Sequence, residues 1–219
     1  MTAYIMNLII SIPGVILAFT VKGWAQAFTA DKLGDPTPRN MGRLTANPMA
    51  HIDLIGFLFI LLFHFGWTKP VPVNTRNFRN IKRDNAIFIL SGPVGCILAG
   101  AVAGFTGAVF SHMILWAPNL SPTVMYYAAL IFYSAEVLCI SLAAFYLLPL
   151  PGLDGYEFIA NLLPYKYYRK LYNIEKYSNY IFMGFILLIY FTNLGSIIFW
   201  PANQLIAGLD TLWDIILPR

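Results

Sequence analysis

The sequence predicts an all-α integral membrane protein, a compact bundle of about four spanning helices in a single domain, residues 1–219. Hydrophobic residues make up 58% of the chain and charged residues only 11%, whereas a soluble domain is roughly half apolar and a quarter charged. Long apolar stretches recur, and most charged residues lie in the connections between them. The chain is long enough for about four to six spans, because each span takes about 20 residues plus a connection.

The first two apolar stretches predict different elements. Residues 4–28 predict a spanning helix with a kink at Pro13-Gly14, because proline removes a helical hydrogen-bond donor. Residues 51–67 form the second stretch, and their uncharged core, residues 54–67, is shorter than the about 20 residues that a span needs. We therefore expect a short re-entrant or interfacial segment that does not cross the membrane.

The next two stretches predict spans. Residues 86–116 are rich in glycine and alanine, and Gly100 and Gly104 give the GxxxG spacing that allows close helix approach. Residues 124–148 follow as the third span, with Glu136 midway along them.

The last third of the chain predicts two more elements. Residues 177–200 are expected to form the fourth span. In residues 203–217 apolar positions alternate with Asp210 and Asp214, which predicts an amphipathic C-terminal helix along the membrane surface.

Charge placement predicts the topology. If the second stretch does not cross, the basic connections all lie on one side, which the positive-inside tendency makes cytoplasmic. The N-terminus and the uncharged residues 117–123 are then outside. The pI near 9.0 reflects this topology and contact with acidic membrane lipids, and it does not indicate nucleic-acid binding. Twelve of the fourteen basic residues lie in these connections: Lys32, Arg39, Arg43, Lys69, Arg76, Arg79, Lys82, Arg83, Lys166, Arg169, Lys170 and Lys176.

Four segments of the chain resemble one known family. They read ADKLGDPTPRNMGRLTANPMAHID (30–53), GWTKPVPVNTRNFRN (66–80), SGP (91–93) and LLPLPGLDG (147–155). In these segments and their spacing the chain is similar to the site-2 proteases, which are intramembrane zinc metalloproteases. The resemblance implies a site-2 protease-like core and a place in a bacterial or archaeal cytoplasmic membrane.

The resemblance also shows where this chain departs from the family. The family carries HExxH, two zinc ligands and a general base, where this chain has Lys22, Gly23 and Gln26. The family's third ligand is retained as Asp154, whereas Tyr146 stands at a position where the family commonly has asparagine. We expect a degenerate member with no catalytic residue, no metal and no cofactor. Restoring Lys22→His, Gly23→Glu and Gln26→His together is expected to recover some zinc binding.

Three functional hypotheses follow. The first is a catalytically inactive membrane protein, a pseudoprotease that serves as a binding or structural subunit for other integral membrane proteins or holds a transmembrane segment. The alternative is an active zinc metalloprotease with a rearranged site that uses Asp154, His51 and Gln26. A minor alternative is an ion or proton pathway through Glu136 and Lys22, since an intramembrane carboxylate indicates function by default. A protonated, hydrogen-bonded Glu136 and a hydrogen-bonded His51 that pins residues 40–53 are the structural interpretations.

The retained aspartate needs a compensating charge. A buried, unpaired carboxylate is destabilising by several kcal/mol, on the order of the desolvation penalty of a single ion. Lys22 stands at the first ligand position of the family, and its long side chain reaches further than an imidazole. We therefore predict an ion pair between Lys22 and Asp154, at about 4 Å or less or through a water, with Gln26 donating a second hydrogen bond.

Overall fold

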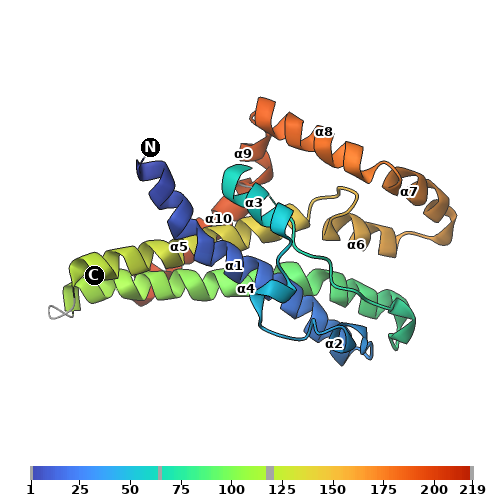
Figure 1. The fold of residues 1–219 in the computed structure, drawn as a ribbon, viewed down its shortest axis with the longest axis horizontal. Coiled ribbons are helices and arrows are strands. Elements are labelled where there is room, and N and C mark those ends of the chain that lie inside the picture. Colours follow the sequence, from blue (N-terminus) through green and yellow to red (C-terminus); the bar gives the residue numbers. More distant parts are fainter. Residues whose placement is uncertain (1, 64–65, 117–120, 218–219) are drawn as a thin grey trace.

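Three long helices form the core of the protein (Figure 1). The structure is a computed structural model that describes residues 2–63, 66–116 and 121–217; most of the expected outer connection, residues 117–123, lies outside these ranges. Among the described residues, these three helices are long and apolar enough to cross a membrane. They confirm the spans expected at 4–28, 86–116 and 124–148: α1 (Thr2–Lys32), α4 (Ile81–Trp116) and α5 (Pro122–Tyr146).

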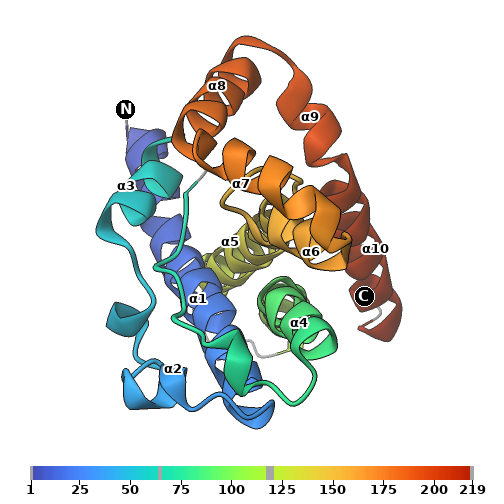
Figure 2. The same ribbon diagram turned by 90° about the vertical axis from the view of Figure 1, so that its right-hand side faces the viewer.

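Small residues let these helices approach closely. Helices α4 and α5 lie side by side, and α1 crosses them (Figures 1 and 2). A Cβ atom at Gly14 of α1 would lie 2.8 Å from Ala135 Cα of α5, and one at Gly100 of α4 would lie 2.8 Å from Ile140 Cγ1. The glycine-rich composition therefore serves helix packing, as the GxxxG spacing predicted. Residues buried between the helices include Val15, Ala18, Phe19, Cys96, Cys139, Leu142 and Ala143.

The second apolar stretch contains one short helix that packs beside α1. Helix α3 (Leu54–Phe63) is about 15 Å long at 1.5 Å per residue, half of the about 30 Å hydrocarbon core. Asp53 Oδ1 accepts from the backbone N–H of Gly56 at 2.8 Å and caps the helix start. The backbone N–H of Lys69 donates to the carbonyl of His51 at 2.9 Å, so both ends of the stretch meet. The described part of the stretch is thus too short to cross, as expected, and a re-entrant or interfacial segment stays the prediction.

The fifth apolar stretch departs from the prediction. The expected single span over residues 177–200 is wrong, because the chain forms the separate helices α8 (Ser178–Phe191) and α9 (Leu194–Ile198) there. Thr192 has extended backbone angles, its hydroxyl donates to Leu188 O at 2.5 Å and it accepts from the backbone N–H of Leu194 at 3.3 Å. These local hydrogen bonds compete with the helical pattern, so α8 is shorter than a span.

The expected C-terminal helix is present. Helix α10 (Trp200–Ile216) packs against α4 and α5, and its place along the membrane surface stays a prediction. The rings of Phe105 and Trp213 lie 5.3 Å apart across the contact between α4 and α10. Amphipathic periodicity identifies a helix with two unlike faces but does not decide what covers the apolar face.

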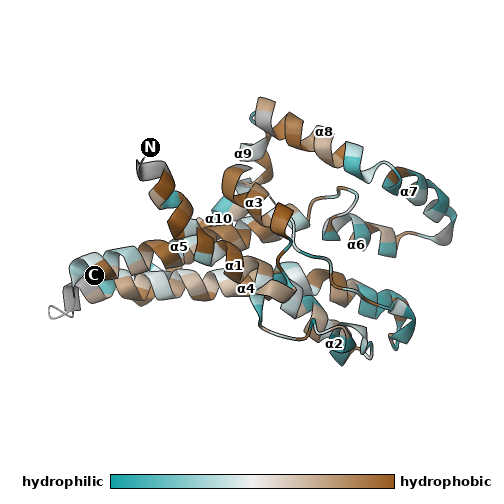
Figure 3. Cartoon of the chain, in the orientation of Figure 1, coloured by the Kyte–Doolittle hydropathy of each residue, from teal (hydrophilic) through white to brown (hydrophobic). Residues whose placement is uncertain are grey.

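The hydrophilic segments gather at one end of the long helices (Figure 3). Asp35 lies there and accepts from Thr37 Oγ1 at 2.6 Å and from Asn77 Nδ2 at 2.7 Å, so the connections after α1 and before α4 touch. The short helices of this polar end are α2 (Thr37–Asn40), η1 (Pro48–Ala50), η2 (Thr75–Asn77), α6 (Asp154–Leu162), η3 (Tyr165–Tyr167) and α7 (Tyr168–Glu175).

Candidate functional site

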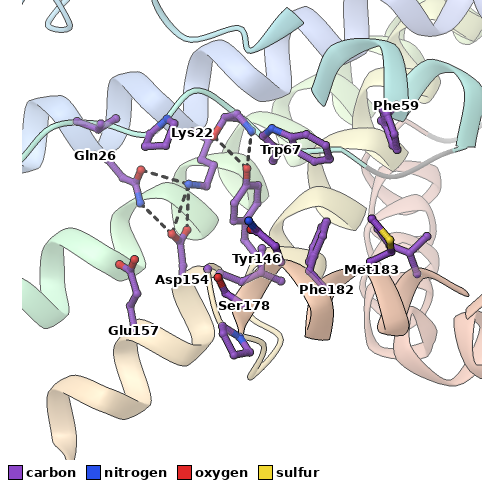
Figure 4. A pocket seen from close by; sticks show the side chains of 18 of the residues that line it. Lys22, Gln26, Phe59, Trp67, Tyr146, Asp154, Glu157, Ser178, Phe182 and Met183 are labelled. Carbon is purple, nitrogen blue, oxygen red and sulfur yellow. Dashed lines mark hydrogen bonds and ion pairs between the residues drawn. The ribbon is translucent and has the colours of Figure 1, made fainter. Parts of the chain in front are cut away.

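A cavity of about 670 Å³ lies where α1, α5 and α6 face the re-entrant segment and α8 (Figure 4). Its size is within the roughly 300–1,000 Å³ usual for ligand sites. One part of the cavity is polar and contains the retained aspartate; the rest is apolar. The apolar wall includes Phe59, Trp67, Phe182, Met183 and Ile186.

Lys22 and Asp154 form an ion pair in the polar part. Lys22 Nζ lies 3.2 Å from Asp154 Oδ2 and 3.4 Å from Oδ1. Gln26 Nε2 donates to Asp154 Oδ1 at 3.3 Å, and Lys22 Nζ donates to Gln26 Oε1 at 3.2 Å. The side chains of Lys22 and Asp154 are only 5% and 10% exposed. The contacts that the sequence predicted among these three residues are therefore present.

The local sequence explains how Asp154 reaches Lys22. Lys22 and Gln26 are one turn apart on α1 and share a face. After α5 the chain turns back through Gly152, whose φ of +91° lies in the left-handed region that favours glycine. At Gly155 a Cβ atom would overlap the carbonyl groups of Leu147 and Leu148. The LPGLDG segment can therefore fold tightly against the end of α5 and place Asp154 at the start of α6.

Tyr146 closes the site on the side of the re-entrant segment. Its ring centroid lies 3.8 Å from Lys22 Nζ, which is a cation–π contact. Its hydroxyl oxygen accepts from the backbone N–H of Thr68 at 2.6 Å and lies 3.0 Å from Thr68 Oγ1. Tyr146 thus covers the lysine and connects the segment that follows α3 to α5.

His51 packs against Gly23 and does not line the cavity. Its side chain is fully buried, and burial lowers its pKa below the ordinary value, so the ring is neutral near pH 7. Nε2–H donates to the carbonyl of Thr45 at 2.8 Å. Nδ1 has no hydrogen-bond partner among the described residues and faces Gly23, where a Cβ atom would overlap the ring. The imidazole therefore occupies the space in which a side chain at position 23 would begin.

Glu136 is a separate feature. It is 1% exposed, lies against Gly104 of α4 and leaves no room there for a Cβ atom. Asp210 of α10 is near enough to act on it electrostatically. Within the described residues its Oε1 has no hydrogen-bond partner. Glu136 does not line the cavity that contains Lys22, so the two residues of the pathway hypothesis belong to different places.

Sequence reasoning missed Glu157. It follows Asp154 by three residues on α6, and both line the cavity. That spacing on one helix face is the signal that could have found it. Burial raises the pKa of Glu157, and the negative charge of Asp154 raises it further.

The donor set at the polar end does not fit zinc. Zinc sites in proteins use histidine nitrogen, cysteine sulfur or carboxylate oxygen, with about three protein ligands in catalytic sites. Here Asp154 is the one such ligand in the Lys22–Gln26–Asp154 cluster, and an ammonium group holds both of its oxygens. In the part of the chain that the structure describes, no group of three or more His, Cys, Asp or Glu residues could hold a metal ion.

A helical membrane bundle with an LDG aspartate facing a helix across a cavity defines a site-2 protease-like class of protein. The chain is 36% identical over 200 residues to "Putative zinc metalloprotease YwhC" of Bacillus subtilis (strain 168), an alignment that covers 90% of this chain and 86% of that protein. The chain therefore belongs to the same site-2 protease-like family of zinc metalloprotease homologues. No family model matches the chain, and no solved structure does.

Proposed function

We propose that this protein is a catalytically inactive, site-2 protease-like membrane protein whose cavity holds a transmembrane segment of another integral membrane protein without cutting it. The observation that carries the proposal is the buried ion pair of Lys22 Nζ and Asp154 Oδ2 at 3.2 Å. It puts a protein cation on the retained ligand, and a lysine ammonium supplies neither a Lewis acid nor an activated water.

The position of the general base supports the same proposal. Peptide hydrolysis in a metalloprotease needs a group that takes a proton from the attacking water. Gly23 has no side chain, and His51 fills the adjacent space. The motif KGWAQ at residues 22–26 is thus degenerate in both its ligands and its base, while the loops around it keep the family's pattern.

The apolar wall of the cavity supports a binding role. Phe59, Trp67, Phe182 and Met183 offer aromatic and flexible contacts, of the kind that suits an apolar segment. We place the polar end in the cytoplasm of a bacterial or archaeal cell, by the positive-inside tendency of its basic connections. Membrane lipids then surround the long helices, whose exposed apolar side chains include Val94, Leu98 and Val102.

The metal content of the purified protein tests catalytic inactivity. We expect zinc far below one equivalent after purification in mild detergent without chelator. Stoichiometric zinc would instead establish the second candidate, an active metalloprotease with a rearranged site, which the relative's printed name favours. His51 and Asp154 would then have to meet through a rearrangement of the 40–53 loop.

A cavity-filling variant tests the binding role. Ile186→Trp adds bulk inside the cavity and should abolish binding of an apolar transmembrane peptide in nanodiscs. Leu188→Trp, on the same helix but outside the lining and 49% exposed, is the matched control and should bind normally. Equal binding by both variants would reject the cavity as the binding site.

A further inference from the structure

The charges of the cavity do not balance. Its lining includes one lysine, Lys22, and two residues with carboxyl groups, Asp154 and Glu157. Lys22 cancels Asp154, which leaves Glu157 as the excess negative group. Glu175 of α7 adds a further negative potential at Glu157. An occupant of this cavity therefore meets a site of net negative charge.

Lys22 is not available to an occupant. Its ammonium group contacts Asp154 at 3.2 Å, Gln26 Oε1 at 3.2 Å and the ring of Tyr146 at 3.8 Å. Its side chain is 5% exposed. Because its donors and its charge are already engaged, an anionic group on an occupant would gain little from it.

Glu157 is in the opposite situation. It faces the cavity next to Asp154 (Figure 4), and part of the residue is open to solvent, although the carboxyl group is sheltered enough for burial to raise its pKa. Among the residues that the structure describes, no cation lies within ion-pair distance of it; the ion pairs found there are Lys22–Asp154 and Asp31–Arg39. A carboxylate that borders an apolar cavity without a partner favours an occupant that brings a cation.

We propose that the transmembrane segment held in the cavity carries a lysine or arginine at the end that reaches the polar part, and that Glu157 pairs with this side chain. The inference rests on the proposed function. The apolar wall, which includes Phe59 and Ile186, contacts the apolar body of the segment. The basic side chain extends past this wall to Glu157, as lysine and arginine side chains extend at membrane boundaries.

The position of Glu157 fits the way membrane segments are flanked. The polar part of the cavity lies at the end of the bundle where this chain's own basic connections gather. A partner in the same membrane obeys the same positive-inside tendency, so its basic flank reaches the membrane boundary at the same level. Charge complementarity and membrane depth therefore select the same kind of occupant.

The test compares three synthetic transmembrane peptides of about 20 leucine and alanine residues that differ at one terminal position, lysine, glutamine or glutamate. The full chain is placed in nanodiscs of uncharged phosphatidylcholine. Energy transfer from a dye at Met49→Cys, a residue 75% exposed, to an acceptor on the peptide gives Kd. The lysine peptide should bind about tenfold more tightly than the glutamine peptide, a difference of about 1.4 kcal/mol, and the glutamate peptide should bind more weakly than either.

Glu157→Gln should remove the preference for lysine, so that the lysine and glutamine peptides bind equally. Glu175→Gln is the matched control: it makes the same chemical change outside the cavity lining and should keep most of the preference. Thermal unfolding in detergent at the same temperature as the unaltered chain shows that a variant is folded.

The outcomes separate the two proposals. If none of the three peptides binds the unaltered chain, the proposed function fails, and this inference with it. If the peptides bind equally, or if the preference for lysine survives Glu157→Gln, the proposed function stands and the role of Glu157 is rejected.

Discussion

Lys22 and Asp154 depend on each other because each would otherwise be an isolated charge in a poorly hydrated place. Replacing Lys22 by methionine or Asp154 by leucine should each destabilise the protein by about 3–5 kcal/mol, the usual effect of removing one partner of a buried pair. The double variant should recover most of this loss. Unfolding in mixed detergent micelles, arranged as a double-mutant cycle, measures the coupling. Strictly additive effects of the two substitutions would contradict a direct ion pair.

His51 changes what can be expected of a restored metalloprotease motif. The imidazole lies where a side chain on Gly23 would begin, so Gly23→Glu requires His51 to move, and the triple restoration is not a simple return of ligands. Gly23→Ala alone should destabilise the fold by about 1–3 kcal/mol through overpacking, and less in a His51→Ala background. Thermal unfolding in detergent measures both values.

Gly208 provides the control for this prediction. It is also a helical glycine, but a Cβ atom there meets nothing within 4 Å, so Gly208→Ala should leave stability unchanged or slightly raise it. Equal losses at Gly23 and Gly208 would show that the contact with His51 does not determine the effect.

At the residue scale, the sequence predicted contacts that follow from helix geometry. The spacing of Lys22 and Gln26 puts them on one face, and the need to neutralise Asp154 supplies their common partner. The sequence did not predict that Tyr146 covers the lysine or that His51 packs on Gly23. Both depend on how α1 sits against segments distant in sequence, and no local pattern encodes that.

At the scale of the elements, Asp35 ties two connections of the polar end together. It accepts from the backbone N–H of Thr37 at 3.2 Å and of Asn74 at 2.8 Å, in addition to the side chains of Thr37 and Asn77. Burial alone would raise the pKa of Asp35, but these hydrogen bonds outweigh it and the pKa lies below its ordinary value. The charged form is thus the one that the fold stabilises.

A pH dependence follows from the lowered pKa. The stability due to Asp35 is present above the unfolded-state pKa of about 3.9 and is lost as pH falls through the lower pKa of the folded state. Asp35→Asn should therefore lower the free energy of unfolding most at pH 6–7, and the difference from the unaltered protein should shrink toward about pH 2. Urea unfolding in detergent at several pH values measures it. A difference that grows as the pH falls would contradict this assignment.

Hydropathy predicted the elements that are continuous in the structure and failed where polar side chains act on the backbone. The spans α1, α4 and α5 and the re-entrant α3 follow from the length of their apolar runs. Residues 177–200 have the same average character, but Thr192 ends α8 through its own hydrogen bonds. An average over a window does not register one side chain that competes for backbone groups.

At the scale of the whole molecule, the arrangement of helices determines which connections share a side of the membrane. We expect α4 and α5 each to cross once, which would place the residues before α4 and those before α5 on opposite sides. The hydrogen bond from Lys69 N–H to His51 O brings both ends of the α3 stretch together. We therefore expect the connection after α1 to lie on the same side as the start of α4. Asp35, which contacts both connections, gives independent evidence for that placement.

Labelling of single cysteines by a membrane-impermeant maleimide in intact cells tests this topology. Met41→Cys is at an exposed position of the connection after α1, and Arg79→Cys is at one just before α4. We expect the cysteines at these two positions to be equally accessible to the reagent, and Ser121→Cys to show the opposite accessibility. The side chain of Ser121 makes no capping hydrogen bond to α5, so its replacement should not disturb the helix. The native Cys96 and Cys139 are buried, so the unaltered chain should remain unlabelled and serve as the control. Protection at Met41 and Arg79 with labelling at Ser121 would place these two basic connections in the cytoplasm. Labelling at only one of Met41 and Arg79 would mean that α3 and the segment that follows it cross the membrane. That result would contradict the re-entrant arrangement.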